Sequence, residues 1–219
     1  MRKKTLVLLL AGTLLLFASC SGTQAPRETK AAKESIEQIT EEAMDFACDA
    51  LFFGDSITAD SSFEDYFPEL RIVNLGVYGD TLEDLLRRVS EVQAADPERI
   101  FLLGGINCLR PDNVELCLEQ YAALLEALKE ACPRARICVE SVLPVGAELD
   151  RGGAENDAVR RFNAALEPLA REQGCDFADL YAVYEKDGAL DPALTRDGIH
   201  LNFNAYGPWA ETIRSLVTP

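Results

Sequence analysis

The sequence predicts an α/β protein in which a five-stranded parallel sheet is covered on both faces by helices, a three-layer α/β/α sandwich. Short, nearly continuous apolar runs recur along the chain, as expected for strands that are buried on both faces. Longer amphipathic segments lie between them, and this alternation is typical of parallel sheets with right-handed crossovers. A length of 219 residues suits one domain with a sizeable core.

Five apolar runs are predicted to form the strands. They cover residues 50–53, 72–75, 100–103, 137–142 and, more weakly, 175–178. Their length favours strands over helices. The two long loops that follow, residues 144–153 and 182–196, are placed to border a site.

Four amphipathic stretches are predicted to form the helices that cover the sheet. Their apolar stripes run over residues 82–92, 114–128, 159–169 and 206–216. We interpret the stripes as core contacts. Thr81 with Asp84, and Asp112 with Glu115, fit the pattern of capping pairs at helix starts.

The first twenty residues resemble the signal peptide of a bacterial lipoprotein. Basic residues 2–4 precede an apolar segment, 5–17, that is too short to span a bilayer comfortably. The following Ala18-Ser19-Cys20 resembles a lipobox, in which the cysteine becomes the lipidated first residue; Phe17 stands where leucine is usual.

This reading divides the chain into three parts: a signal peptide at 1–19, a lipidated Cys20 with a tether at 20–33, and one domain at 34–219. The protein is then expected to be exported and held by its lipid in the bacterial cell envelope, outside the cytoplasm. An ordinary signal peptide with a coincidental cysteine is the alternative.

Charge and cysteine usage limit the partners. A formal net charge of −16 argues against nucleic acid as a partner, because such surfaces need clustered lysine and arginine. With one histidine and no C-x-x-C pair, a metal site is not expected. Six cysteines besides Cys20 are either small apolar core residues or partners in disulfides, such as one between Cys108 and Cys117.

The only histidine, His200, suggests a nucleophilic site. It follows Asp197 by three residues, close enough in a turn for the carboxylate to orient the ring, and Ser56 lies far upstream in a Gly-Asp-Ser segment. A serine nucleophile needs a base at neutral pH, and imidazole suits that role best. A lone histidine is more often a surface or core residue, so this interpretation depends on the other motifs.

Three further groups are expected at the same edge of the sheet, where parallel strands end and ligands bind. Ser56 follows the first strand at the start of a helix, where its N–H and the helix dipole can stabilise an oxyanion. Gly76 follows the second strand and can present its N–H closely; Asn107 follows the third and offers an amide donor. Individually, each is an ordinary turn residue.

In order and spacing, these segments resemble the SGNH/GDSL-family hydrolases, close to their short-chain esterase and acetylhydrolase-like branch. The four blocks that carry the resemblance are residues 53–58, 74–81, 104–107 and 197–202, and the similarity covers about residues 50–216. The resemblance implies the flavodoxin-like SGNH hydrolase fold and no cofactor. Phosphate-loop and dinucleotide fingerprints are also missing from the sequence.

The resemblance also implies a role for each residue. Ser56 is the nucleophile, His200 the base, and Asp197 orients His200. The N–H groups of Ser56 and Gly76 and the Asn107 amide form the oxyanion hole. The family usually has aspartate after this asparagine, whereas this chain has Cys108.

The expected function is hydrolysis of short-chain acyl esters, including O-acetyl groups on carbohydrates, through an acyl-serine intermediate. No long apolar segment resembles a lid for acyl chains. A lysophospholipase or thioesterase acting on longer chains is one alternative. A non-catalytic, lipid-anchored binding module of the same fold is another. The α/β-hydrolase pattern does not fit, because the chain has no G-x-S-x-G elbow.

Overall fold

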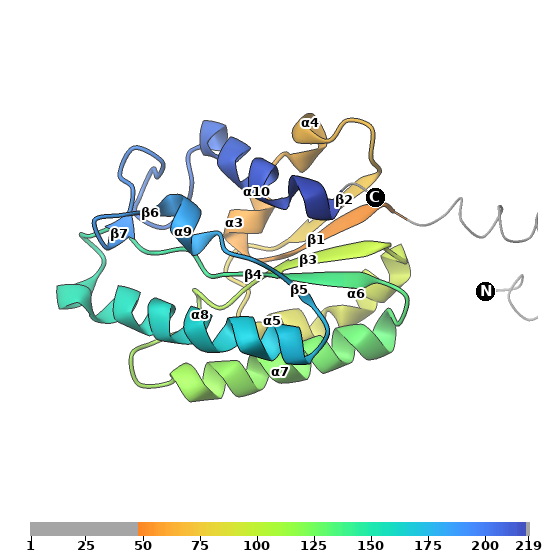
Figure 1. Cartoon of the computed structure of the whole chain (residues 1–219), viewed down its shortest axis with the longest axis horizontal. Helices are drawn as coiled ribbons and strands as arrows, with labels where there is room; N and C mark the ends of the chain where they lie inside the picture. Colours follow the sequence, from red (N-terminus) through yellow and green to blue (C-terminus); the bar gives the residue numbers. More distant parts are fainter. Residues whose placement is uncertain (1–47, 218–219) are drawn as a thin grey trace, which may run out of the picture. The chain divides into compact units, whose positions relative to one another are not determined.

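The computed structural model describes residues 48–217 (Figure 1). The predicted signal peptide at 1–19, Cys20, the predicted tether at 20–33 and the first part of the predicted domain therefore lie outside the described residues. Within the described part, no helix combines the length and apolarity needed to cross a membrane.

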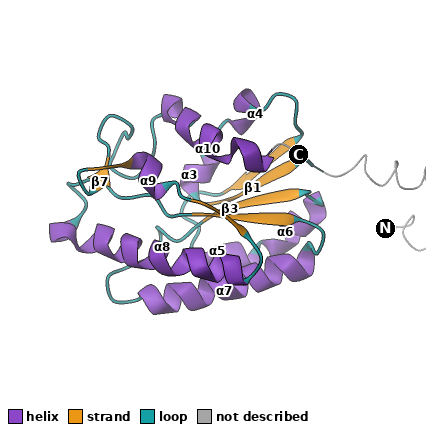
Figure 2. Ribbon diagram, in the orientation of Figure 1, coloured by secondary structure: helices purple, strands orange, loops and turns teal. Residues whose placement is uncertain are grey.

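Five parallel strands form the central sheet, in the spatial order β2-β1-β3-β4-β5. Figure 2 draws the strands in orange between the helices. They are β1 (Ala50–Gly54), β2 (Ile72–Gly76), β3 (Arg99–Leu103), β4 (Arg136–Glu140) and β5 (Asp176–Ala178). All five predicted strands and the three-layer α/β class are confirmed.

The end of β4 differs from the expectation, which extended this strand to residue 142. The side chain of Asn163 forms hydrogen bonds with both backbone groups of Val142. Its Oδ1 accepts from the Val142 N–H at 2.9 Å, and its Nδ2 donates to the Val142 carbonyl at 2.8 Å. Because these groups are used, Val142 cannot extend the strand ladder, and the strand ends at Glu140.

Helices cover both faces of the sheet, which makes the three layers visible in Figure 1. One face carries α5 (Leu82–Arg87), α6 (Val89–Ala95), α7 (Val114–Ala131) and α8 (Ala154–Glu172). The other carries α3 (Ser56–Ala59), α4 (Phe63–Tyr66), α9 (Tyr181–Tyr184) and α10 (Gly207–Val217). Smaller elements are the hairpin of β6 (Glu185–Lys186) and β7 (Ala189–Leu190), and the 3₁₀ turns η1 (Arg151–Gly153) and η2 (Phe203–Ala205).

The strands divide their side chains between two apolar cores. In β1, Leu51 and Phe53 face the core under α5 to α8, whereas Ala50 and Phe52 face the core under α10. Alternate residues of a strand point to opposite faces, so a strand buried on both faces needs a continuous apolar run. This explains why the apolar runs identified the strands.

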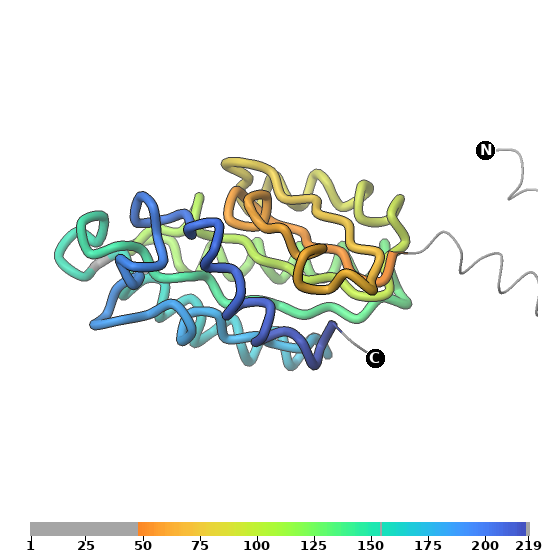
Figure 3. Tube along the Cα trace, turned by 90° about the horizontal axis from the view of Figure 1, so that it is seen from above, coloured from red at the N-terminus to blue at the C-terminus, as the bar shows by residue number. Residues whose placement is uncertain are grey.

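A buried polar contact lies in the core beneath α10. The rings of Trp209 in α10 and Phe63 in α4 pack in a T-shaped arrangement, with their centroids 5.2 Å apart. In the view from above, α10 runs beside α4 (Figure 3). The indole N–H of Trp209 donates to Glu140 Oε1 at 2.6 Å. Burial raises the pKa of Glu140 to about 8, and the bond from Trp209 acts in the opposite direction.

The helix predicted over residues 82–92 is two helices, because the chain breaks at Arg88 between α5 and α6. The Arg88 guanidinium donates to the Leu75 carbonyl at 3.0 Å and pairs with the Asp80 carboxylate, and both partners belong to the segment that leaves β2. At the start of α5, the predicted capping box of Thr81 and Asp84 is confirmed.

The capping pair predicted for the next helix is wrong. Asn113, and not Asp112, is the N-cap of α7, and its side chain caps no helical N–H. Instead, Asn113 Oδ1 accepts from the Arg110 N–H at 2.7 Å and Nδ2 donates to the Cys108 carbonyl at 2.9 Å. The side chain therefore closes the preceding loop.

The register of the sheet places three loops at one edge. Gly54 at the end of β1 pairs with Gly76 at the end of β2 and with Leu103 at the end of β3. The residues that follow these three positions consequently leave the sheet side by side.

Candidate active site

A tight turn from β1 into α3 presents Ser56. Asp55 is the N-cap of α3, and its Oδ1 accepts from the Ile57 N–H at 2.9 Å. The turn needs glycine before it, because a Cβ on Gly54 would lie 2.5 Å from the Leu103 carbonyl oxygen. Ser56 is the first residue of α3, so its N–H has no acceptor within the helix.

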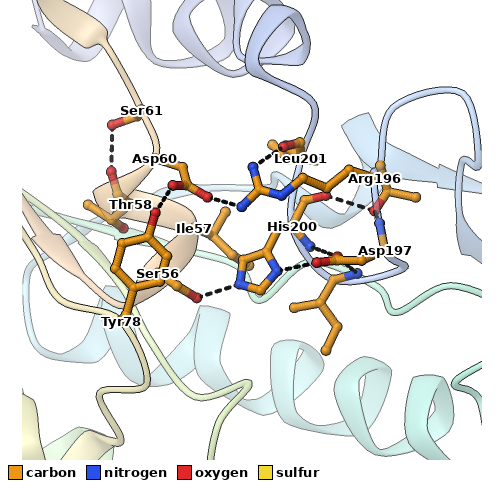
Figure 4. A network of polar contacts seen from close by, with 12 residues as sticks. Ser56, Ile57, Thr58, Asp60, Ser61, Tyr78, Arg196, Asp197, His200 and Leu201 are labelled. Atoms are coloured by element: carbon orange, nitrogen blue, oxygen red, sulfur yellow. Dashed lines mark hydrogen bonds and ion pairs between the residues drawn. The ribbon is translucent and has the colours of Figure 1, made fainter.

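Ser56, His200 and Asp197 form a continuous hydrogen-bonded chain (Figure 4). Ser56 Oγ lies 2.9 Å from His200 Nε2, and His200 Nδ1 lies 2.7 Å from Asp197 Oδ2. Ser56 is buried and the His200 side chain is about one quarter exposed, at 24%. The structure thus brings together the serine, the imidazole and the carboxylate that the sequence singled out.

The turn that contains Asp197 and His200 fixes their relative position. Asp197 Oδ1 accepts from the N–H groups of Ile199, at 3.0 Å, and His200, at 2.8 Å, while Oδ2 contacts the ring. Partial burial alone would raise the pKa of Asp197, but these bonds outweigh it and hold the pKa at about 2. The carboxylate is therefore ionised at neutral pH.

A second network joins this turn to helix α3, which begins with Ser56. Arg196 forms an ion pair with Asp60, the C-cap residue of α3, whose side chain is only 5% exposed. Arg196 also donates to the Leu201 carbonyl at 3.2 Å, and the Tyr78 hydroxyl donates to Asp60 (Figure 4). Sequence reasoning missed these residues, because Asp60 and Arg196 are 136 positions apart and carry no motif of their own.

The side chain of Asn107 is held in place by a backbone group and not by a carboxylate at the next position, where Cys108 stands. Its Nδ2 donates to the Asp80 carbonyl at 2.9 Å, which uses one of its two amide hydrogens and leaves the other for a ligand. Asp80 is held in turn by its ion pair with Arg88. Cys108, in place of the aspartate, turns inward, with Sγ 3.3 Å from the Gly105 carbonyl oxygen.

Gly76 lies at the expected edge, but its N–H is already bonded. It donates to Asn74 Oδ1 at 2.8 Å, which differs from the expectation of a free oxyanion donor. Its missing side chain has another consequence, because a Cβ there would lie 2.2 Å from the Ala59 backbone nitrogen. Glycine at this position lets α3 pack directly against the end of β2.

Asp55 is a buried acid directly beside Ser56. Burial raises its pKa to about 7, whereas the bond from Ile57 and the nearby His200 ring lower it. Its Oδ2 has no hydrogen-bond partner among the described residues.

The six cysteines in the described part of the chain form no disulfide bonds. Cys108 and Cys117, the pair that the sequence offered as a disulfide, have their sulfur atoms 4.0 Å apart. In residues 48–217, histidine, cysteine and acidic side chains do not cluster in a way that could hold a metal ion.

A pocket of about 320 Å³ opens beside Asn107. Ile199, next to His200, forms part of its wall, and the loop of residues 144–153 contributes Val145, Leu149 and Arg151. Arg110, three residues after Asn107, completes the side nearest that amide. The pocket therefore includes Asn107, and Ile199 links its wall to the turn that carries His200.

Comparisons with known proteins agree with this fold. Over residues 52–207 the chain matches the GDSL-like Lipase/Acylhydrolase family. No curated protein matches it.

Solved structures share its architecture at low sequence identity. A Streptococcus pneumonia protein whose name refers to platelet activating factor has a TM-score of 0.68 at 21% identity, covering 98% of this chain and 99% of its own. A GDSL-like lipase from Bacteroides thetaiotaomicron has a TM-score of 0.66 at 21% identity, covering 83% and 96%. An acetyl xylan esterase has a TM-score of 0.65 at 20% identity, covering 77% and 99%. Since the family match spans most of the described domain, the chain belongs to the GDSL-like lipase/acylhydrolase family.

Proposed function

We propose that the protein is a serine esterase that cleaves short-chain acyl esters through an acyl-serine intermediate. One observation carries the proposal: Ser56, His200 and Asp197 are linked by contacts of 2.9 and 2.7 Å in the order nucleophile, base and orienting carboxylate. Membership of a family of acylhydrolases supports the same reaction class.

In the proposed reaction, Ser56 Oγ attacks the ester carbonyl carbon while His200 Nε2 accepts the hydroxyl proton. The ionised Asp197 stabilises the imidazolium that forms. His200 then gives the proton to the departing alkoxide, which leaves an acyl group on Ser56. A water molecule, deprotonated by His200, attacks this acyl group; the bond to Ser56 Oγ then breaks, His200 returns the proton to Oγ, and the carboxylic acid is released.

The oxyanion of each tetrahedral intermediate needs hydrogen-bond donors. We assign the Ser56 N–H and the second amide hydrogen of Asn107, because neither is used by a helical or loop contact. Gly76 would join them only if Asn74 released its N–H. Two donors are enough for an oxyanion hole in acyl transfer.

For the substrate, we propose short acyl groups, including O-acetyl groups on carbohydrates. The moderate volume of the pocket, about 320 Å³, supports small substrates. One protein of similar fold is an acetyl xylan esterase, which acts on esters of this kind by its name.

Hydrolysis of p-nitrophenyl acetate, butyrate and octanoate, compared with a Ser56→Ala variant, tests the reaction and the chain length together. We expect the rate to be highest with acetate, and to fall by roughly 10⁴-fold or more in the variant. A maximum at octanoate would favour a lysophospholipase or thioesterase. A folded protein with no activity would favour a binding module, and an active variant as fast as the wild type would exclude Ser56 as the nucleophile.

We also propose that residues 1–19 direct export and that a lipid on Cys20 holds the protein in the bacterial cell envelope. The basic residues, the apolar segment and the Ala-Ser-Cys sequence support this. Growth with an alkyne-tagged fatty acid should label the wild type and a Cys48→Ser control, but not Cys20→Ser. An unlabelled wild type, or a labelled Cys20→Ser variant, would contradict the anchor.

A further inference from the structure

Arg110 stands apart from the other arginines of this acidic protein. The chain has a net charge of −16, and each of the other arginines in residues 48–217 has a carboxylate within 4 Å. Arg110 has no ion pair with any described residue. The position of Arg110 in the fold shows what its unpaired positive charge faces.

That position is the pocket beside the candidate oxyanion hole. The Arg110 guanidinium donates to the Leu109 carbonyl at 2.6 Å and to the Asn107 carbonyl at 3.3 Å, so the side chain folds back along the loop that carries the amide donor. These bonds use two of the five N–H donors of the guanidinium. The remaining donors are available to a ligand in the pocket.

The other charges in the pocket largely cancel. Arg151 and Glu155 both line it and pair with each other at 3.8 Å. Most of the remaining wall is apolar, formed by side chains such as Ile106, Val145 and Ile199. Arg110 is therefore the one uncompensated charge in a mainly apolar pocket, and its exposed side chain is accessible to a ligand.

We propose that this pocket binds a carboxylate group of the substrate, so that the natural ester is an anionic one recognised by Arg110. The inference rests on the proposed esterase function. A guanidinium binds a carboxylate through two parallel N–H···O bonds, which gives both charge and orientation. An acylated acidic sugar, with the charge on the alcohol side, and a monoester of a dicarboxylic acid, with the charge on the acyl side, share this chemistry.

Two matched substrate pairs test the proposal and distinguish these sources. For the acyl side, mono-4-nitrophenyl adipate is compared with 4-nitrophenyl hexanoate. For the alcohol side, 4-acetoxybenzoate is compared with its methyl ester. The measured quantity is the ratio of kcat/KM for the anionic ester to kcat/KM for its neutral partner.

We expect Arg110→Gln to lower this ratio by about tenfold in at least one pair, mainly through a higher KM for the anionic ester. Arg110→Lys keeps the charge and should retain part of the preference. Arg134→Gln is the matched control: it removes the same charge from a side chain that is 85% exposed and paired with Asp96, and it should leave the ratio unchanged.

The ratio separates substrate recognition from damage to the loop. If Arg110→Gln only loosened Asn107, both members of a pair would slow equally and the ratio would stay constant. A constant ratio in both pairs would overturn the proposal, while Ser56-dependent cleavage of the neutral esters would leave the esterase function standing. No cleavage of any ester by the folded protein would overturn both.

Discussion

Arg196 and Asp60 form an ion pair that connects the two halves of the candidate site. Asp60 ends the helix that begins with Ser56, and Arg196 directly precedes the turn that holds Asp197 and His200. The ion pair therefore joins the two segments that carry Ser56 and His200. We infer that it helps to keep Ser56 Oγ within 2.9 Å of His200 Nε2.

Loss of this ion pair should reduce turnover more than substrate binding. In Asp60→Asn, the weaker contact to Arg196 allows the imidazole to move relative to Ser56, and we expect kcat to fall roughly 10- to 100-fold with a smaller change in KM. Steady-state kinetics on p-nitrophenyl acetate measures both parameters. Asp96→Asn, which removes the exposed pair with Arg134, is the control and should change neither. An equally active Asp60→Asn protein would exclude this positioning role.

Asp197→Asn should be strongly impaired at both pH 6 and pH 8. Asparagine can still accept the N–H groups of Ile199 and His200, so the turn is kept, but the charge that stabilises the imidazolium is lost. We expect kcat to fall roughly 10³- to 10⁴-fold.

Because the pKa of Asp197 is about 2, its carboxylate is ionised in the wild type at both pH 6 and pH 8. Asp197→Asn should therefore be slower than the wild type by about 10³-fold or more at both values. A variant as active as the wild type at pH 6 would mean that Asp197 is already protonated there.

Glu140 should make the folded protein less stable as the pH rises. Its pKa is raised by burial from the ordinary value of 4.5 to about 8. Between these values the folded protein keeps a proton that the unfolded chain has released. The stabilisation is complete below about pH 4.5 and is lost progressively up to about pH 8, at no more than about 1.4 kcal/mol per pH unit.

Glu140→Gln removes this titration while keeping an acceptor for Trp209. Denaturant unfolding at pH 5, 6, 7 and 8 should show a smaller decline in the free energy of unfolding for the variant than for the wild type. Parallel declines would show that Glu140 does not hold its proton across this range.

Gly76→Ala should destabilise the protein by roughly 3 kcal/mol or more, because the added methyl group would meet the backbone of Ala59 rather than a flexible side chain. Gly207→Ala is a suitable control, since its Cβ would meet only Tyr66, at an ordinary 3.8 Å. Thermal unfolding of both variants measures the difference. Equal melting temperatures would show that α3 can move away from β2 at little cost.

Much of the fold was predictable because burial leaves a local record in the sequence. A strand such as β1 is apolar at every position, and a helix such as α7 is apolar at every third or fourth. The break at Arg88 and the early end of β4 were not predictable, because each depends on a side chain that bonds to a distant backbone group.

The site divides in the same way. Ser56, Asp197, His200 and Asn107 could be proposed because they stand at strand ends and in recognisable blocks. The bond from Gly76 to Asn74 and the pair of Asp60 with Arg196 arise only when the chain folds. The same holds for the lack of an ion pair at Arg110 within residues 48–217. No local pattern reports which of many carboxylates an arginine will meet.

The separation of Ser56 and His200 by 144 positions has a consequence for synthesis of the protein. The proposed nucleophile and its proposed amide donors come from the first half of the domain, and the proposed base arrives with the segment that leads into α10. A nascent chain that lacks this segment holds a serine without a base. Hydrolytic competence should therefore appear late, in a single step, when that segment docks.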